Sequence, residues 1–315
     1  MRSFAVREAS AADAPGIRRL FARVFGQELP AEEWEWKFAR NPDGWFGVVA
    51  ESDGRIVGNY AGWATPLMIG GTPRLAYAVG DVATDPDVRA AGGLRGIYRA
   101  MVETFYDRAR EQGVAFCFGF PNARALEISN RIAHTRTIFP IREVRVPCGA
   151  FAAPPEESVA GDSVGEGFDA LWAAAAHHRP DGPVRDRCRV NWRFHARPTR
   201  YYRMVSVGPP DALESWAALS VLGATAVVAD HVGRAADGSD LPRLLAASAA
   251  EAARLGAREL LFWESPGNPL GPFLDRLPGQ RRDAGFSLAA RAMEEETARG
   301  FFARCHLPPS LYDVT

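Results

Sequence analysis

The fold of this chain is decided by residues 80–113, which read GDVATDPDVRAAGGLRGIYRAMVETFYDRAREQG. The stretch begins as an apolar strand, passes through a turn rich in Gly, Pro, Asp and Arg, and opens a helix. Ile97, Met101, Phe105 and Ala109 recur every fourth residue and give this helix one apolar face. A strand, a glycine turn and a helix in this order are typical of an anion-binding cradle, because the first N–H groups of a helix are unpaired and glycines permit close approach.

The glycine turn is neither a P-loop nor a dinucleotide-binding loop, because it has no Gly-Lys-Ser/Thr and no Gly-x-Gly-x-x-Gly. It resembles the acyl-coenzyme A loop of the Gcn5-related N-acetyltransferases (the GNAT superfamily), in which Arg/Gln-x-x-Gly-x-Gly/Ala enters a helix. Two registers fit. If Arg89 opens the motif, Gly92 matches and Leu94 replaces a small residue. If Gly96 is the anchoring glycine, Gly93 stands in the Arg/Gln position. A plain strand-to-helix turn with solvated arginines is the alternative.

The order of the elements expected between residues 4 and 146, βα(α)βββαβαβ, resembles the GNAT fold throughout. The strands are expected at 4–7, 45–51, 55–63, 75–84 and 114–120, and two further helices at 30–40 and 123–132.

The second half of the chain repeats the plan of the first. Residues 36–42, WKFARNP, are echoed by residues 192–198, WRFHARP, and residues 226–263 repeat the order strand, helix, strand. We therefore expect an α/β (mixed α+β sheet) protein of two tandem GNAT-like domains, each with a mixed central sheet flanked by helices. The expected parts are an N-terminal domain at 1–149, a linker at 150–166, a degenerate C-terminal domain at 167–296 and a tail at 297–315.

The loop of the second copy, GRAADGSD at residues 233–240, differs from the first in charge. Asp237 and Asp240 lie where a pyrophosphate would bind, and Pro242 removes one donor from the helix start. Two carboxylates repel an anion, so we expect one working coenzyme site, in the N-terminal half.

Composition narrows the classes of function. A net charge of -1 over 315 residues gives no basic footprint for nucleic acid. The four cysteines are too far apart for a recognisable metal or disulfide pattern. No long apolar run predicts a membrane span, so a cytoplasmic location is expected. The expected partner is a small-molecule amine acceptor, with no nucleic acid and no membrane, and the chain is expected to be a monomer or a homodimer.

The resemblance implies transfer of an acyl group from acetyl-CoA, or another acyl-CoA, to a primary amine without a metal. Residues 34–42 and 191–203 are also similar to segments of bacterial tandem GNAT proteins, some of which acylate nucleotide-linked amino sugars. A non-catalytic GNAT-like binding module and an aminoacyl-tRNA-dependent transferase are the alternatives, and the near-neutral charge disfavours the second.

The resemblance also implies the binding residues. The main chain of Val82, Ala83 and Thr84 is expected to pair with pantetheine. Asn122 is expected to cap the next helix and face the coenzyme channel. The candidates for the pyrophosphate cradle are Arg89, Gly92, Gly93, Leu94, Arg95, Gly96 and Ile97.

Asp81, at the end of the strand, is the candidate base, and a strand-end cap or an ion pair with an arginine is its alternative role. The tyrosine that serves as general acid in many GNAT enzymes is replaced here by Ser129. Tyr98, His134 or a water molecule are the candidates for that role.

Overall fold

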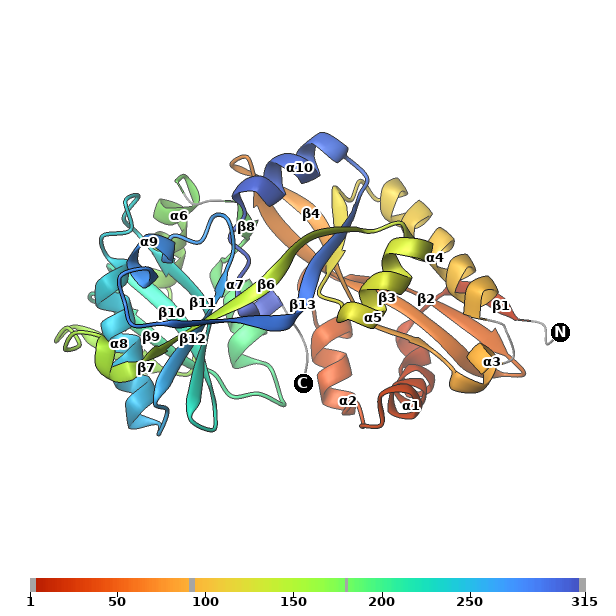
Figure 1. Cartoon of the computed structure of the whole chain (residues 1–315), viewed down its shortest axis with the longest axis horizontal. Helices are drawn as coiled ribbons and strands as arrows, with labels where there is room; N and C mark the ends of the chain where they lie inside the picture. Colours follow the sequence, from red (N-terminus) through yellow and green to blue (C-terminus); the bar gives the residue numbers. More distant parts are fainter. Residues whose placement is uncertain (1–3, 91–93, 179–180, 312–315) are drawn as a thin grey trace. The chain divides into compact units, whose positions relative to one another are not determined.

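The computed structural model describes residues 4–90, 94–178 and 181–311 (Figure 1). The chain forms two compact units, and neither is one continuous stretch of sequence. Unit 1 comprises Met1–Pro66, Arg74–Phe139 and Gly285–Ala298, and unit 2 comprises Leu67–Pro73, Pro140–Ala284 and Arg299–Thr315. None of the helices in the described ranges has the length and apolar character needed to cross a membrane.

Unit 1 contains the strand order β1-β2-β3-β4-β5-β13. The strands are β1 (Ala5–Glu8), β2 (Trp45–Ser52), β3 (Arg55–Ile69), β4 (Thr72–Thr84), β5 (Phe116–Gly119) and β13 (Gln280–Ala292). The helices are α1 (Ala14–Phe25), α2 (Ala31–Trp34), α3 (Pro86–Ala90), α4 (Leu94–Glu111) and α5 (Ala123–Ile128). The expected order of elements is confirmed, with the short helix α3 as an addition.

The core of unit 1 lies between α4 and the sheet. Figure 1 shows β2 and β3 between α4 on one side and α1 and α2 on the other. Ile97, Met101, Phe105 and Ala109 are all buried in this core, as their spacing predicted. The Phe105 ring lies 4.9 Å from the Tyr60 ring, centroid to centroid, and is fully buried.

Phe105→Ala is expected to lower the free energy of unfolding by about 3–5 kcal/mol, because it removes a fully buried ring and leaves a cavity among other aromatic rings. Urea unfolding measures this. Glu103→Ala, on the exposed side of the same helix, is the control and should change stability by less than about 0.5 kcal/mol. Equal losses in the two variants would contradict the placement of the core.

Unit 2 contains the strand order β6-β12-β11-β10-β9-β7. Its strands are β6 (Arg136–Pro147), β7 (Ser158–Gly161), β8 (Gly182–Pro183), β9 (Arg203–Val207), β10 (Ser215–Leu222), β11 (Thr225–Gly233) and β12 (Glu259–Glu264). The helices are α6 (Gly167–Ala176), α7 (Arg187–Val190), α8 (Leu241–Arg254), α9 (Gly271–Leu274) and α10 (Glu295–Arg304). Parallel pairing of β4 with β5 and of β11 with β12, among antiparallel pairs, makes the sheet mixed, so the expected α/β class is confirmed.

One strand of each unit comes from the other half of the sequence. Residues 289–292 of β13 pair with β5 in unit 1, and residues 142–147 of β6 pair with β12 in unit 2. The division therefore differs from the expected boundaries at 149 and 296, because local patterns predict a strand but not its distant partner.

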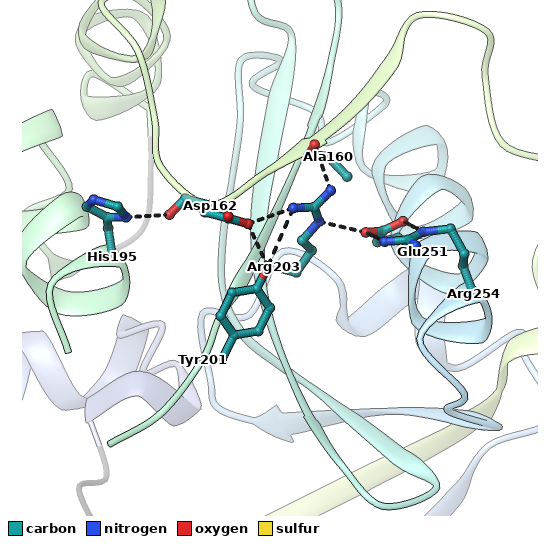
Figure 2. A network of polar contacts seen from close by, with 7 residues as sticks. All are labelled: Ala160, Asp162, His195, Tyr201, Arg203, Glu251 and Arg254. Atoms are coloured by element: carbon teal, nitrogen blue, oxygen red, sulfur yellow. Dashed lines mark hydrogen bonds and ion pairs between the residues drawn. The ribbon is translucent and has the colours of Figure 1, made fainter. Parts of the chain in front are cut away.

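The expected linker at 150–166 also contains structure. Its residues 158–161 form β7, which pairs with β9. Figure 2 shows a polar network beside this pair. The Arg203 guanidinium donates to the carboxylates of Asp162, at 2.6 Å, and Glu251, at 2.7 Å. The network joins the end of β7 to β9 and α8, so the segment is an edge of the unit 2 sheet rather than a free connection.

This network predicts a dependence of stability on pH. The guanidinium groups of Arg254 and Arg203 lower the pKa of Glu251. Its contribution is therefore present above the ordinary pKa of 4.5 and lost as the pH falls through the lowered value. The urea midpoint of the wild type should exceed that of Glu251→Gln at pH 7, and the difference should shrink below about pH 4.5. A constant difference from pH 7 to pH 3 would contradict this role.

The repeat inferred from the sequence is visible in local structure. In unit 1, α2 runs directly into a π-helical turn, Glu35–Ala39, which carries the WKF segment. In unit 2, α7 runs into the π-helical turn Asn191–His195, which carries WRF. Trp34, Trp36 and Trp63 are buried in unit 1.

Candidate functional site

The strands β4 and β5 part at a defined point. Their parallel ladder joins Ala76 to Phe116 and ends at Ala78 and Phe118. Gly119 follows, and a Cβ atom there would lie 2.9 Å from the carbonyl oxygen of Val79, so a side chain is excluded. Because β4 continues to Thr84, its edge beyond Ala78 offers backbone donors and acceptors to a ligand.

The residues expected to bind through their main chain lie on this part of β4. Ala83 and Thr84 are buried, and half-buried Val82 packs against the core that contains α4. Their side chains are therefore committed to packing, so backbone groups are what these residues can offer, as the resemblance implied.

The start of α4 is described in part. Gly92 and Gly93 lie outside the described residues, as do the side chains of Arg89, Leu94 and Arg95. Gly96 is exposed in the first turn of α4, and a Cβ atom there would be 3.9 Å from the Phe4 ring. The Ile97 side chain is buried in the core, so only its backbone is suited to an anion.

Asp81 is held in an unusual conformation. Its φ is +52°, which few residues other than glycine adopt. Its Oδ2 accepts a hydrogen bond from Lys37 Nζ at 2.7 Å, and its carbonyl oxygen accepts one from Asn59 Nδ2 at 2.9 Å. The sequence suggested an arginine as a possible partner, and the partner is a lysine. Sequence reasoning assigned no role to Lys37 or Asn59.

Tyr98 and His134 are the two residues that the sequence offers as the general acid. Tyr98 is buried beside Tyr60, with ring centroids 5.9 Å apart, and burial raises the pKa of Tyr98 to about 12. His134 is exposed and has a φ of +53° at the end of the π-helical turn Ser129–Ala133. Within the described residues, no hydrogen bond or ion pair joins Tyr98 or His134 to Asp81.

Two residues near β5 make local contacts. Asn122 Oδ1 accepts a hydrogen bond from the N–H of Ala125 at 3.0 Å, so the expected helix cap is confirmed. Ser129, at the position of the missing tyrosine, donates to the Leu126 carbonyl oxygen at 3.1 Å. The Ser129 hydroxyl is therefore engaged within its own helix.

Unit 2 has a corresponding opening that its own groups occupy. The ladder between β11 and β12 ends at Val227 and Leu261. In the following loop, Asp240 Oδ2 accepts a hydrogen bond from the N–H of Ala235 at 3.0 Å. A carboxylate of the chain thus holds a loop amide that a bound phosphate would need, and its charge would repel one.

Within the described residues, one group of side chains has ligand atoms close enough together to hold a metal ion, and it lies in unit 2. Asp230, His231 and His306 are buried, with potential ligand atoms within 4.8 Å of one another. Arg185 Nε lies 2.9 Å from both carboxylate oxygens of Asp230. A divalent cation would face this fixed positive charge, so the cluster is better described as a buried ion pair packed against two imidazoles.

Comparison with known proteins finds a matching domain and similar structures. Residues 5–131 match the model of the acetyltransferase (GNAT) domain. The chain is similar to a probable N-acyltransferase from Enterococcus faecalis, with 15% identity, a TM-score of 0.70 and coverage of 94% of this chain and 74% of that one. A GCN5-related N-acetyltransferase from Anabaena variabilis gives 14% identity, a TM-score of 0.68 and the same coverage.

A tandem GNAT protein from the clavulanic acid biosynthesis pathway, solved without AcCoA, gives 13% identity, a TM-score of 0.58 and coverage of 92% of this chain and 98% of that one. No protein with a curated function matches. At these identities the structural likeness concerns the fold alone. Residues 5–131 thus match the acetyltransferase (GNAT) domain, and the fold of the chain is that of a tandem GNAT protein.

Proposed function

We propose that this chain is an acyl-CoA-dependent N-acyltransferase that transfers an acyl group, most simply acetyl, directly to a primary amine of a small molecule. The observation that carries the proposal is the parting of β4 and β5 after Ala78, with β4 continuing to Thr84 and α4 starting at Leu94, after the short helix α3. This places backbone hydrogen-bonding groups and a helix N-terminus next to each other along the chain, which suits an amide-rich ligand that ends in phosphates.

Acyl-CoA, when bound, supplies the acyl group as a thioester. In the reaction a C–N bond forms between the acyl carbon and the amine, and the C–S bond breaks. The amine nitrogen loses two protons: the first leaves the ammonium before attack, and the second goes to the departing thiolate, directly or through solvent. The protein must accept the proton that the acceptor's ammonium loses. Asp81 is the proposed acceptor, directly or through a water molecule, because its carboxylate lies on β4 beyond the end of the ladder.

The proposed stoichiometry is one coenzyme per chain. Unit 1 offers an exposed glycine, Gly96, in the first turn of its helix, whereas the loop of unit 2 binds its own Asp240. Coenzyme binding by unit 2 would require that carboxylate to leave the Ala235 amide.

The test of this function is release of the free thiol of coenzyme A from acetyl-CoA, followed with a thiol reagent in the presence of primary amines. Nucleotide-linked amino sugars come first in the panel because the chain resembles tandem GNAT proteins that acylate them. Amine-dependent thiol release with formation of the amide is the expected result. Binding of acetyl-CoA without turnover on any amine would contradict the enzymatic proposal and favour a binding module.

A further inference from the structure

We propose that Lys37 is a positioning residue for acyl transfer: it holds the Asp81 carboxylate in place through Oδ2 and leaves Oδ1 to take the proton from the acceptor amine. This inference rests on the proposed function. It concerns a residue of the first repeat segment, WKFARNP, to which the sequence assigned no catalytic role.

The Lys37 side chain is built into unit 1. It is only 3% exposed, and its Nζ lies 2.7 Å from Asp81 Oδ2. The same Nζ lies 4.4 Å from the centroid of the Trp63 ring and 5.5 Å from that of Phe38. The two rings hold the ammonium group in place, and the carboxylate that it contacts is held with it.

The backbone of Asp81 is fixed independently. Asn59, itself 1% exposed, donates to the Asp81 carbonyl oxygen from the neighbouring strand. At Gly80, a Cβ atom would lie 2.8 Å from the Trp63 ring, so the chain passes close to the same aromatic wall. A left-handed φ at a non-glycine residue is costly and persists where its surroundings enforce it, as they do here.

Unit 2 contains an ion pair, Asp230 with Arg185, that corresponds to the pair of Asp81 with Lys37 in unit 1. Asp230 lies three residues beyond the last ladder residue of β11, Val227, just as Asp81 lies three beyond Ala78. Each aspartate pairs with a buried cation. Both oxygens of Asp230 accept from Arg185, and its side chain is 5% exposed.

Asp81 is paired through one oxygen only. Its side chain is 13% exposed, and within the described residues no donor contacts its Oδ1. The ion pair of unit 2 thus engages both carboxylate oxygens, whereas the ion pair of unit 1 engages one. An ion pair that served the fold alone would not require that the cation contact one carboxylate oxygen in unit 1 and both in unit 2.

The first test uses the protein without any ligand. The carboxyl carbon of Asp81, identified by the loss of its NMR signal in Asp81→Asn, is observed at one fixed pH in the wild type, Lys37→Met and Lys37→Arg. Loss of the contact with the Lys37 ammonium is expected to change the chemical shift of this carbon in Lys37→Met, while Lys37→Arg stays close to the wild type. Equal chemical shifts in all three proteins would overturn the inference.

The second test separates kcat from KM with acetyl-CoA and an accepted amine at one fixed pH. In Lys37→Met kcat should fall by about tenfold or more while the KM for acetyl-CoA changes little, and Lys37→Arg should restore kcat. An unchanged kcat in Lys37→Met, or an equal loss of kcat and of acetyl-CoA affinity, would overturn the inference while leaving acyl transfer intact. Absence of turnover by the wild type with every amine would instead overturn the proposed function, and this inference with it.

Discussion

Gly96→Asp is expected to abolish acyl-CoA binding while leaving the fold intact. The new carboxylate would stand in the first turn of α4, where the proposed pyrophosphate binds. Two unit charges about 4 Å apart near a protein surface repel by about 4 kcal/mol, which weakens binding roughly a thousandfold. Isothermal titration calorimetry measures the loss.

The fold is expected to survive because the site has room. Among the described residues, a Cβ atom on Gly96 meets the Phe4 ring, at 3.9 Å, and a carboxylate near a helix N-terminus is favourable to the helix itself. Gly96→Ala is the matched control, since it adds the Cβ atom without the charge and keeps the amide. Equal weakening in both variants would point to shape rather than charge, and normal binding by Gly96→Asp would remove this turn from the site.

Asp81→Asn is expected to lower kcat by about 10²–10⁴-fold with little change in acyl-CoA affinity, because an amide cannot take up the proton of the acceptor amine. Asparagine tolerates the left-handed backbone that Asp81 adopts at φ +52°, so the strand should keep its course. Rates of thiol release and calorimetric affinities together separate the two effects.

Asp53→Asn is the matched control for that variant. Asp53 shares the left-handed backbone, with a φ of +51°, but is exposed in the turn between β2 and β3. Its replacement should leave both rate and affinity unchanged. An unaltered rate in Asp81→Asn would remove Asp81 from the mechanism, and an equal loss in Asp53→Asn would show that the substitution itself acts through the fold.

Single helices and hairpins could be predicted from the sequence because the residue patterns that mark them lie within the elements themselves. The four-residue spacing from Ile97 to Ala109 marks the buried face of α4, and Asn122 caps α5 as expected. The turn Ser-Asp-Gly at 52–54 marks the hairpin of β2 and β3. In each case the signal and the structure lie within a few residues of each other, so no knowledge of distant partners was needed.

The pairings between distant segments could not be predicted in the same way. The pattern of residues 280–292 says nothing of β5, with which β13 pairs. Lys37 lies in an aromatic segment that predicts burial, and its ion pair with Asp81 joins residues that are 44 positions apart. The carboxylate of Asp240 was expected to repel an anion, but its bond to the Ala235 amide depends on the shape of the loop.

The most direct test of the account is a calorimetric titration of the whole chain with acetyl-CoA, repeated with Gly96→Asp and with Asp240→Ala. The account predicts one site per chain, lost in Gly96→Asp and unchanged in Asp240→Ala. No binding by the wild type at millimolar acetyl-CoA, or binding that Gly96→Asp leaves intact and Asp240→Ala alters, would contradict a single coenzyme site formed by β4 and α4.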